Sequence, residues 1–154
     1  MNTFSPQSKV WVYQSDRFFT EAEVADLTDA LQRFASQWTA HSHQLQAAGE
    51  VRYNRFIVLM VDETQASASG CSIDSSVHFL KGIEKHTGVS LFDRQQIAYR
   101  KGNEIKTVPM QELAAALESG ELTPETIVFN NTVTTKAQLE ANWEMPLQAT
   151  WMNR

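Results

Sequence analysis

The chain has a single cysteine among its 154 residues, so it cannot form an internal disulfide bond. A lone thiol suits a reducing compartment. Long apolar runs are also missing: the longest, Phe56 to Val61, has six residues, well short of the roughly 20 that a membrane-spanning helix needs. The first residues lack the basic region and apolar core of a secretory signal. We therefore expect a cytoplasmic protein that does not insert into membranes.

Positive charge is scarce and dispersed. The 13 Lys and Arg residues never form a run of three, and the formal net charge is -5. A nucleic-acid surface needs clustered positive charge to displace counterions from the phosphates. The composition therefore predicts no nucleic-acid partner. It leaves a small molecule or another protein as the partner, with the oligomeric state open.

Motifs for cofactors are absent as well. The pair His41-x-His43 has no matching Cys-x-x-Cys or His-Glu-x-x-His partner, so no metal site is expected. Neither Gly-x-x-x-x-Gly-Lys-[Ser/Thr] nor Gly-x-Gly-x-x-Gly occurs, so the common nucleotide-binding loops are not expected. A phosphatase loop would carry an arginine six residues after Cys71, where Val77 stands. We expect no cofactor.

What is present is a composition typical of one globular domain, with 42% hydrophobic and 20% charged residues. A chain of this length buries enough surface to fold without disulfides or metal. No internal repeat or Pro/Gly/Ser-rich linker divides it. We expect a single domain over residues 1–154, with residues 1–8 as a loose tail.

Two long helices are indicated by caps and apolar periodicity. Thr20 and Glu23 form a capping box, and an apolar stripe follows at steps of three and four residues: Val24, Leu27, Leu31, Phe34 and Trp38. A second helix is predicted from Ser72 to Thr87, where Gly88 ends it. Shorter helices are expected from Pro109 to Gly120 and from Thr135 to Trp143.

The strands are indicated by β-prone runs. Arg55 to Asp62 is apolar on both alternating faces, which is typical of a central strand covered on both sides. Further strands are expected at Lys9 to Gln14, Ile97 to Arg100, Glu104 to Val108 and Thr126 to Phe129. The order of elements predicts an α+β fold, with a mixed β-sheet of about five strands covered by three main helices. A three-layer α/β fold is the alternative.

The stretch Ser69 to Ser76 is the strongest candidate site. It lies between the strand that ends at Asp62 and the second helix, and its residues are mostly small and polar. Free N–H groups at the start of a helix bind anions. The stretch therefore predicts a binding site for a small polar or anionic ligand, formed by Ser69, Gly70, Ser72, Asp74 and Ser75.

A thiol-dependent enzyme is the alternative for the same stretch. Cys71 would be the nucleophile, His41 the base and Asp62 the group that orients the base. Asp74, one turn further on, opposes this because its negative charge disfavours a thiolate. Cysteine is also often buried and then behaves as a small apolar residue, so an inert, buried Cys71 is a further alternative.

Asn130 and Asn131 follow the last predicted strand. If that strand lies parallel to the central one, the two amides share an edge of the sheet with Asp62 and Cys71, and they add a polar rim to the ligand site. Asparagine also tolerates left-handed backbone, so a structural role in a turn is the alternative.

Three stretches resemble a family of short Bacteroidetes-type proteins that carries the label ABC transporter ATPase: Trp11 to Arg17, Ala68 to Ser76 and Thr126 to Asn131. The resemblance covers nearly the whole chain. The label implies ATP hydrolysis that drives transport. The chain has no Walker A loop, and its Ala68 to Cys71 segment matches only part of the transporter signature Leu-Ser-Gly-Gly-Gln. The resemblance therefore implies no residue roles.

Residues Ala98 to Phe129 resemble the strand–strand–helix–strand core of GYF-type adaptor domains. Tyr99, the turn at Gly102 and the stop at Gly120 carry the resemblance, whereas the Gly-Tyr-Phe or Gly-Pro signature is absent. This resemblance implies a protein-interaction adaptor that binds peptides through its surface. The adaptor is the second alternative to a small-ligand binding domain.

Overall fold

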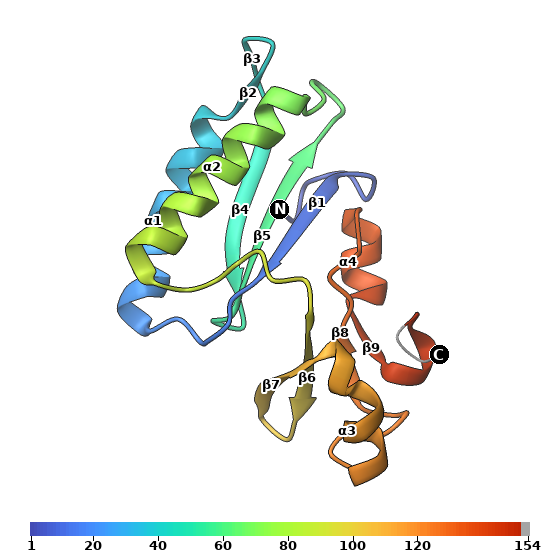
Figure 1. Cartoon of the computed structure of the whole chain (residues 1–154). Helices are drawn as coiled ribbons and strands as arrows, with labels where there is room; N and C mark the ends of the chain where they lie inside the picture. The colour runs from blue at the N-terminus through green and yellow to red at the C-terminus, as the bar shows by residue number, and fades with distance from the viewer. Residues whose placement is uncertain (152–154) are drawn as a thin grey trace.

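A computed structural model describes residues 1–151 of the chain (Figure 1). The last three residues of the expected domain, 152–154, lie outside the described residues. The first sheet has β5 (Phe56–Asp62) at its centre, between β1 (Lys9–Gln14) and β4 (Gln46–Arg52). All seven residues of β5 are buried, as expected for a strand covered on both faces.

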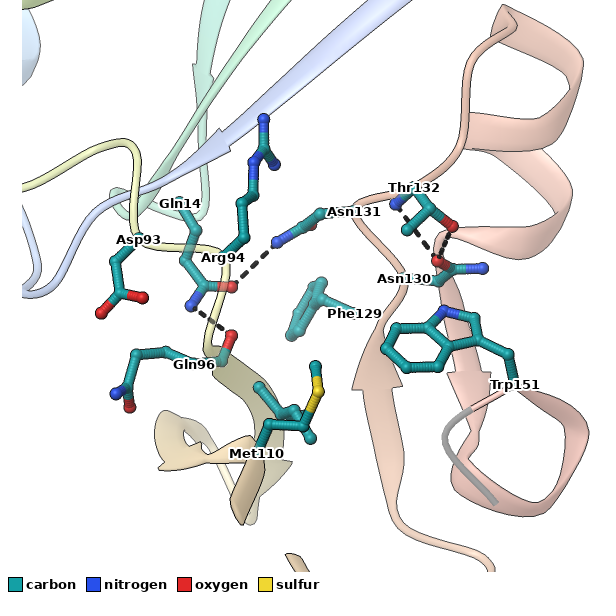
Figure 2. Close-up of a pocket in the computed structure, with 11 residues that line it drawn as sticks. Gln14, Asp93, Arg94, Gln96, Met110, Phe129, Asn130, Asn131, Thr132 and Trp151 are labelled. Carbon is teal, nitrogen blue, oxygen red and sulfur yellow. Dashed lines mark hydrogen bonds between the residues drawn. The ribbon is translucent and has the colours of Figure 1, made fainter. Parts of the chain in front are cut away.

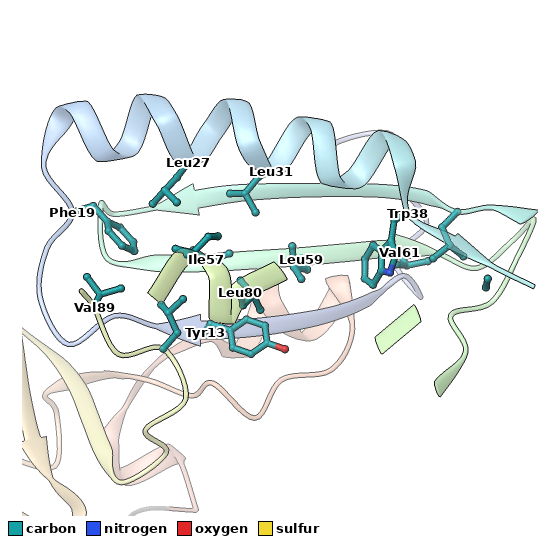
Figure 3. Packing of buried hydrophobic residues seen from close by; sticks show 14 residues of the cluster. Tyr13, Phe19, Leu27, Leu31, Trp38, Ile57, Leu59, Val61, Leu80 and Val89 are labelled. Atoms are coloured by element: carbon teal, nitrogen blue, oxygen red, sulfur yellow. The ribbon is translucent and has the colours of Figure 1, made fainter. Parts of the chain in front are cut away.

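Two helices cover one face of this sheet (Figure 1), and buried side chains pack between the helices and the sheet (Figure 3). They are α1 (Glu21–Gln37) and α2 (Gly70–Thr87). The predicted capping box begins α1: the Thr20 hydroxyl accepts the Glu23 N–H at 3.1 Å, and the Glu23 carboxylate accepts the Thr20 N–H at 2.9 Å. The helices and the sheet enclose an apolar core that includes Leu31, Leu59 and Leu80.

The second sheet has the strand order β7-β6-β8-β9. Its strands are β6 (Gln96–Lys101), β7 (Glu104–Pro109), β8 (Ile127–Phe129) and β9 (Glu144–Pro146). The helices of this part are α3 (Leu113–Ser119) and α4 (Lys136–Asn142), with single 3₁₀ turns at Met110–Glu112 and Leu147–Ala149. A two-stranded ribbon of β2 (Thr39–Ala40) and β3 (His43–Gln44) follows α1.

The far face of the first sheet packs on this C-terminal part of the chain. Phe56, Val58 and Met60 of β5 share one apolar cluster with residues of β6, β8 and α4 and with the residue that follows α4: Ala98, Phe129, Leu139 and Trp143. The first sheet is therefore the middle layer between the two long helices and the C-terminal elements.

The α+β class is confirmed, but the single mixed sheet is wrong. Within residues 1–151 every strand pair is antiparallel, and the strands form two main sheets and one short ribbon. The α/β alternative, which requires parallel strands, is also not found. The reason is β4, which was not predicted: it forms a hairpin with β5 and takes one edge of the first sheet, while β8 pairs with β6.

Residues 1–8, expected as a loose tail, make specific contacts. The Ser5 N–H donates to the Asp62 carboxylate at 2.9 Å, and Ser8 is buried. The Lys136 ammonium donates to the Asn2 and Phe4 carbonyl oxygens. No helix within residues 1–151 combines the length and the apolar character that crossing a membrane requires.

Candidate functional site

In the loop predicted to bind a ligand, Ser69 and Ser72 form capping hydrogen bonds with each other. The Ser69 hydroxyl accepts the Ser72 N–H at 3.1 Å, and the Ser72 hydroxyl accepts the Ser69 N–H at 2.5 Å. Ser72 is buried, and its carbonyl oxygen accepts the indole N–H of Trp38 at 2.7 Å. These contacts give both serines a structural role at the start of α2.

The other predicted residues of this stretch lie on the surface. Gly70, Asp74 and Ser75 are exposed, and the Ser75 hydroxyl donates to the Cys71 carbonyl oxygen at 3.1 Å. Cys71 itself is an exposed free thiol, so the alternative of a buried, inert cysteine is wrong.

The proposed Cys71–His41–Asp62 group is not joined by hydrogen bonds within residues 1–151. His41 is exposed at the turn between β2 and β3, with a left-handed φ of 51°. The Asp62 carboxylate instead accepts the backbone N–H groups of Ser5, at 2.9 Å, and of Thr64, at 3.1 Å. These two bonds lower the pKa of Asp62 below its usual value, and the bond from Ser5 has the larger effect.

The predicted sheet edge shared by Asn130 and Asn131 with Asp62 and Cys71 is wrong, because β8 belongs to the second sheet. Asn130 and Asn131 both line a cavity of about 370 Å³ where β1, β6 and the end of β8 meet (Figure 2). We refer to it as the inter-sheet cavity. It is lined by Gln14, Asp93, Arg94, Gln96, Ile97, Met110, Phe129, Asn130, Asn131, Thr132 and Trp151.

A chain of side-chain hydrogen bonds forms one wall of the inter-sheet cavity. The Trp143 indole N–H donates to Asn131 Oδ1 at 2.9 Å, and Asn131 Nδ2 donates to Gln14 Oε1 at 2.9 Å. Gln14 Nε2 in turn donates to the Gln96 carbonyl oxygen at 3.3 Å. Gln14 is only 7% exposed, so burial and these bonds hold its amide in one orientation.

The floor of the cavity is apolar. Phe129 and Ile97 are buried, and Met110 is half-buried beside them. The Phe129 ring lies 5.1 Å from the Trp143 ring and 4.7 Å from the Phe56 ring, which fixes the floor to both sheets. Trp151 stands at the cavity's edge and is 42% exposed.

Arg94 lies where the inter-sheet cavity adjoins a second hollow of about 440 Å³. The two share Arg94, Asn131 and Thr132, and the second hollow extends along β1 to Ile73 on α2. One guanidinium nitrogen of Arg94 donates to the Val12 carbonyl oxygen at 3.0 Å, and the guanidinium lies 5.4 Å from the centre of the Tyr13 ring. Burial raises the pKa of Tyr13, and the charge of Arg94 partly offsets this.

Of the predicted residues, only Asn130 and Asn131 line this cavity, and Gln14, Arg94, Phe129 and Trp151 were missed. Gln14 ends a predicted strand, but nothing in its sequence neighbourhood marks it as part of a site. Within residues 1–151 no group of three or more His, Cys, Asp or Glu side chains is placed to hold a metal ion.

Comparisons of the chain with protein-family models, with curated proteins and with solved structures gave no match.

Proposed function

We propose that the protein binds a small molecule in the inter-sheet cavity. The observation that carries the proposal is the combination of an apolar floor with a wall of fixed amides in one hollow of about 370 Å³. Ligand pockets are typically about 300–1,000 Å³, mostly apolar, and contain a few well-placed polar groups. The fixed amides and the apolar floor favour a ligand with an apolar body and at least one hydrogen-bonding group.

The lining favours binding over catalysis. Its ionisable side chains within residues 1–151 are Asp93 and Arg94, and one oxygen of Asp93 accepts the Gln95 N–H at 2.8 Å. Nucleophilic catalysis needs a nucleophile hydrogen-bonded to a base, and among the described residues no such pair lines the cavity. The exposed Cys71 does not line this cavity either.

Trp151 provides the test. A library of small aromatic and aliphatic compounds is screened by thermal shift, and the compounds that raise the melting temperature are titrated by calorimetry. We expect Trp151→Ala to weaken binding several-fold, because an aromatic contact at the cavity's edge is lost. Phe18→Ala is the matched control, since Phe18 is similarly exposed at 44% and does not line the cavity. Compounds whose affinity is the same for Trp151→Ala and the wild type would contradict the proposal.

Protein interaction is a second candidate function, favoured by one observation. The order β6-β7-α3-β8 reproduces the strand–strand–helix–strand order of GYF-type adaptor domains. A peptide bound in that way would shift the NMR signals of α3 and the β6–β7 hairpin. A ligand in the inter-sheet cavity would instead shift those of Gln14, Asn131 and Trp151.

A further inference from the structure

Arg94 is a cation without a carboxylate partner within residues 1–151. Arg17, Arg33, Arg52 and Arg100 each pair with a carboxylate at 2.6–2.8 Å. The buried Arg55 has three backbone carbonyl partners instead. Arg94 has one hydrogen bond, to the Val12 carbonyl oxygen. Arg94 is exposed, so water solvates the N–H donors that Val12 does not take, and its place at the junction of two hollows puts those donors within reach of an anionic ligand.

The guanidinium of Arg94 is held in place before any ligand arrives. Its bond to Val12 and its contact with the Tyr13 ring fix the group at the edge of β1. A guanidinium carries N–H donors in a rigid, planar fork, so the donors that Val12 does not use remain free for an acceptor. Such a fork matches the two oxygens of a carboxylate.

The charge around Arg94 favours a monoanion. Among residues 1–151, the lining of the inter-sheet cavity has one cation, Arg94, and one carboxylate, Asp93, and the amides of Asn130 and Asn131 are neutral. Lys9, which lines the adjoining hollow, pairs with Glu63 at 3.6 Å. Asp93 and the Arg94 guanidinium point to different sides of the cavity in Figure 2. A phosphate dianion would have its two negative charges balanced by Arg94 alone and would be repelled by Asp93. The single charge of a ligand carboxylate is balanced by Arg94.

We propose that the ligand is a monocarboxylate whose apolar body lies on Phe129 and Met110 beside Trp151 and whose carboxylate binds Arg94. This inference rests on the proposed function, because it assigns a ligand class to the same cavity. Arg94 and the apolar floor line the same cavity, so the carboxylate and the apolar body of one ligand would contact different parts of it. Thr132 and Asn131, shared by both hollows, flank the carboxylate end.

Matched pairs of acid and amide test the proposal. The probes are benzoate and benzamide, hexanoate and hexanamide, and indole-3-acetate and indole-3-acetamide. Each pair has the same apolar body, and only the acid is charged at neutral pH. Calorimetry is carried out on the wild type, on Arg94→Gln and on Arg33→Gln. Arg33 is the matched control because it is exposed on α1, pairs with Asp29 and lines neither hollow.

We expect at least one acid to bind the wild type about tenfold more tightly than its amide. A hydrogen bond between charged groups contributes enough free energy for a difference of this size. Arg94→Gln should remove this preference, and Arg33→Gln should keep it. Arg94→Lys keeps the charge without the fork and should retain only part of the preference. The acid–amide comparison on the wild type stands even if Arg94→Gln does not fold.

The outcomes separate the two proposals. Equal affinity for acid and amide, or a preference that Arg94→Gln retains, would overturn the carboxylate assignment and leave the small-molecule cavity intact. Absence of binding by every probe would overturn the assignment, while hits from the library in the preceding test would still support the cavity. Inorganic phosphate that displaces the bound acid at equal concentration would overturn the choice of carboxylate.

Discussion

The Tyr53 hydroxyl donates a hydrogen bond of 2.5 Å to the Glu144 carboxylate, which ties the β4–β5 turn of the first sheet to β9 of the second. Arg100 of β6 binds the other oxygen of Glu144 at 2.6 Å, and its guanidinium lies 4.7 Å from the centre of the Tyr53 ring. The hydrogen bond to Glu144, and then burial, raise the pKa of Tyr53. Because Phe129 packs 5.9 Å from the Tyr53 ring, this contact also supports the cavity floor.

Tyr53 and Asn54 form the turn itself, and both have left-handed backbone, with φ of 54°. They are the two central residues of a turn that the Arg55 N–H closes by donating to the Arg52 carbonyl oxygen at 3.1 Å, within a three-residue loop that pairs Arg52 with Phe56. Positive φ at both central residues favours Asn and Gly and strains a bulky residue. The contacts of the Tyr53 side chain offset the strain at this position.

Tyr53→Phe tests the tie between the sheets. The variant keeps the ring that stacks on Trp143 at 5.7 Å and loses only the hydroxyl bound to Glu144. We expect the free energy of unfolding in urea to fall by about 1 kcal/mol, the usual net value of such a bond. Asn54→Gly is the control: it suits the same left-handed backbone and should change the free energy by less than about 0.5 kcal/mol. A Tyr53→Phe variant as stable as the wild type would show that the hydroxyl bond contributes nothing.

Gly49→Ala tests how closely α1 approaches β4. An added Cβ would lie 3.0 Å from the Leu59 side chain and 3.1 Å from that of Leu31, both in the core. Overpacking of this kind destabilises by about 1–3 kcal/mol, measured by denaturant unfolding. Gly82→Ala on α2 is the matched control, because an added Cβ there meets no atom within 4 Å. It should stabilise the protein by about 0.5–1 kcal/mol through helix propensity, and equal effects at the two positions would contradict the close approach.

Asp62→Asn tests the anchor of the N-terminal segment by its pH dependence. The pKa of Asp62 is lowered in the folded state, chiefly by the Ser5 N–H, so the carboxylate stabilises the fold above its unfolded-state pKa. That contribution is lost as the pH falls through the lowered folded-state pKa. We expect the variant to lose less unfolding free energy than the wild type between neutral pH and about pH 3.

The control for this pH test is Asp74→Asn, because Asp74 is exposed on α2. It should keep the pH dependence of the wild type. Hydrogen exchange at the Ser5 and Thr64 amides should rise in Asp62→Asn alone. Unchanged exchange at both amides would mean that the carboxylate does not hold them.

Cys71 should be alkylated by iodoacetamide in the folded protein, because the thiol is exposed. His41→Ala should leave the rate unchanged, since no hydrogen bond joins the two side chains in residues 1–151. Cys71→Ser should alter the unfolding free energy by less than about 0.5 kcal/mol, as surface substitutions do. The rate is followed by mass spectrometry, and a marked slowing in His41→Ala would revive the thiol-enzyme alternative.

Local signals in the sequence predicted individual elements well. The capping box at Thr20, the left-handed stop at Gly88 and the Gly102 turn lie where the structure has them, since each depends on a few adjacent residues. β4 was missed because Gln46 to Glu50 lacks β-branched and aromatic residues. It is a strand because it pairs with β5 and packs under α1, which no local pattern reports.

The inter-sheet cavity escaped prediction for the same reason. Gln14 and Asn131, which are bonded to each other, stand 117 residues apart, and neither belongs to a motif. Only the pairing of β8 with β6, instead of a place beside β5, brings them together. The predicted edge shared by Asn131 and Cys71 required β8 to lie beside β5. The hydrophobic pattern of β8 does not tell whether this strand pairs with β5 or with β6.

The order in which the two faces of β5 are covered has a consequence for synthesis. The helices that cover one face of β5 are complete once α2 has been made. On the other face, Phe56, Val58 and Met60 are covered by residues after 97, among them Leu139 and Trp143. A nascent chain with only its first 90 residues outside the ribosome therefore presents an apolar, strand-rich surface to its surroundings. Such surfaces recruit chaperones and aggregate, so the last third of the chain protects the protein from aggregation by burying this face of the sheet.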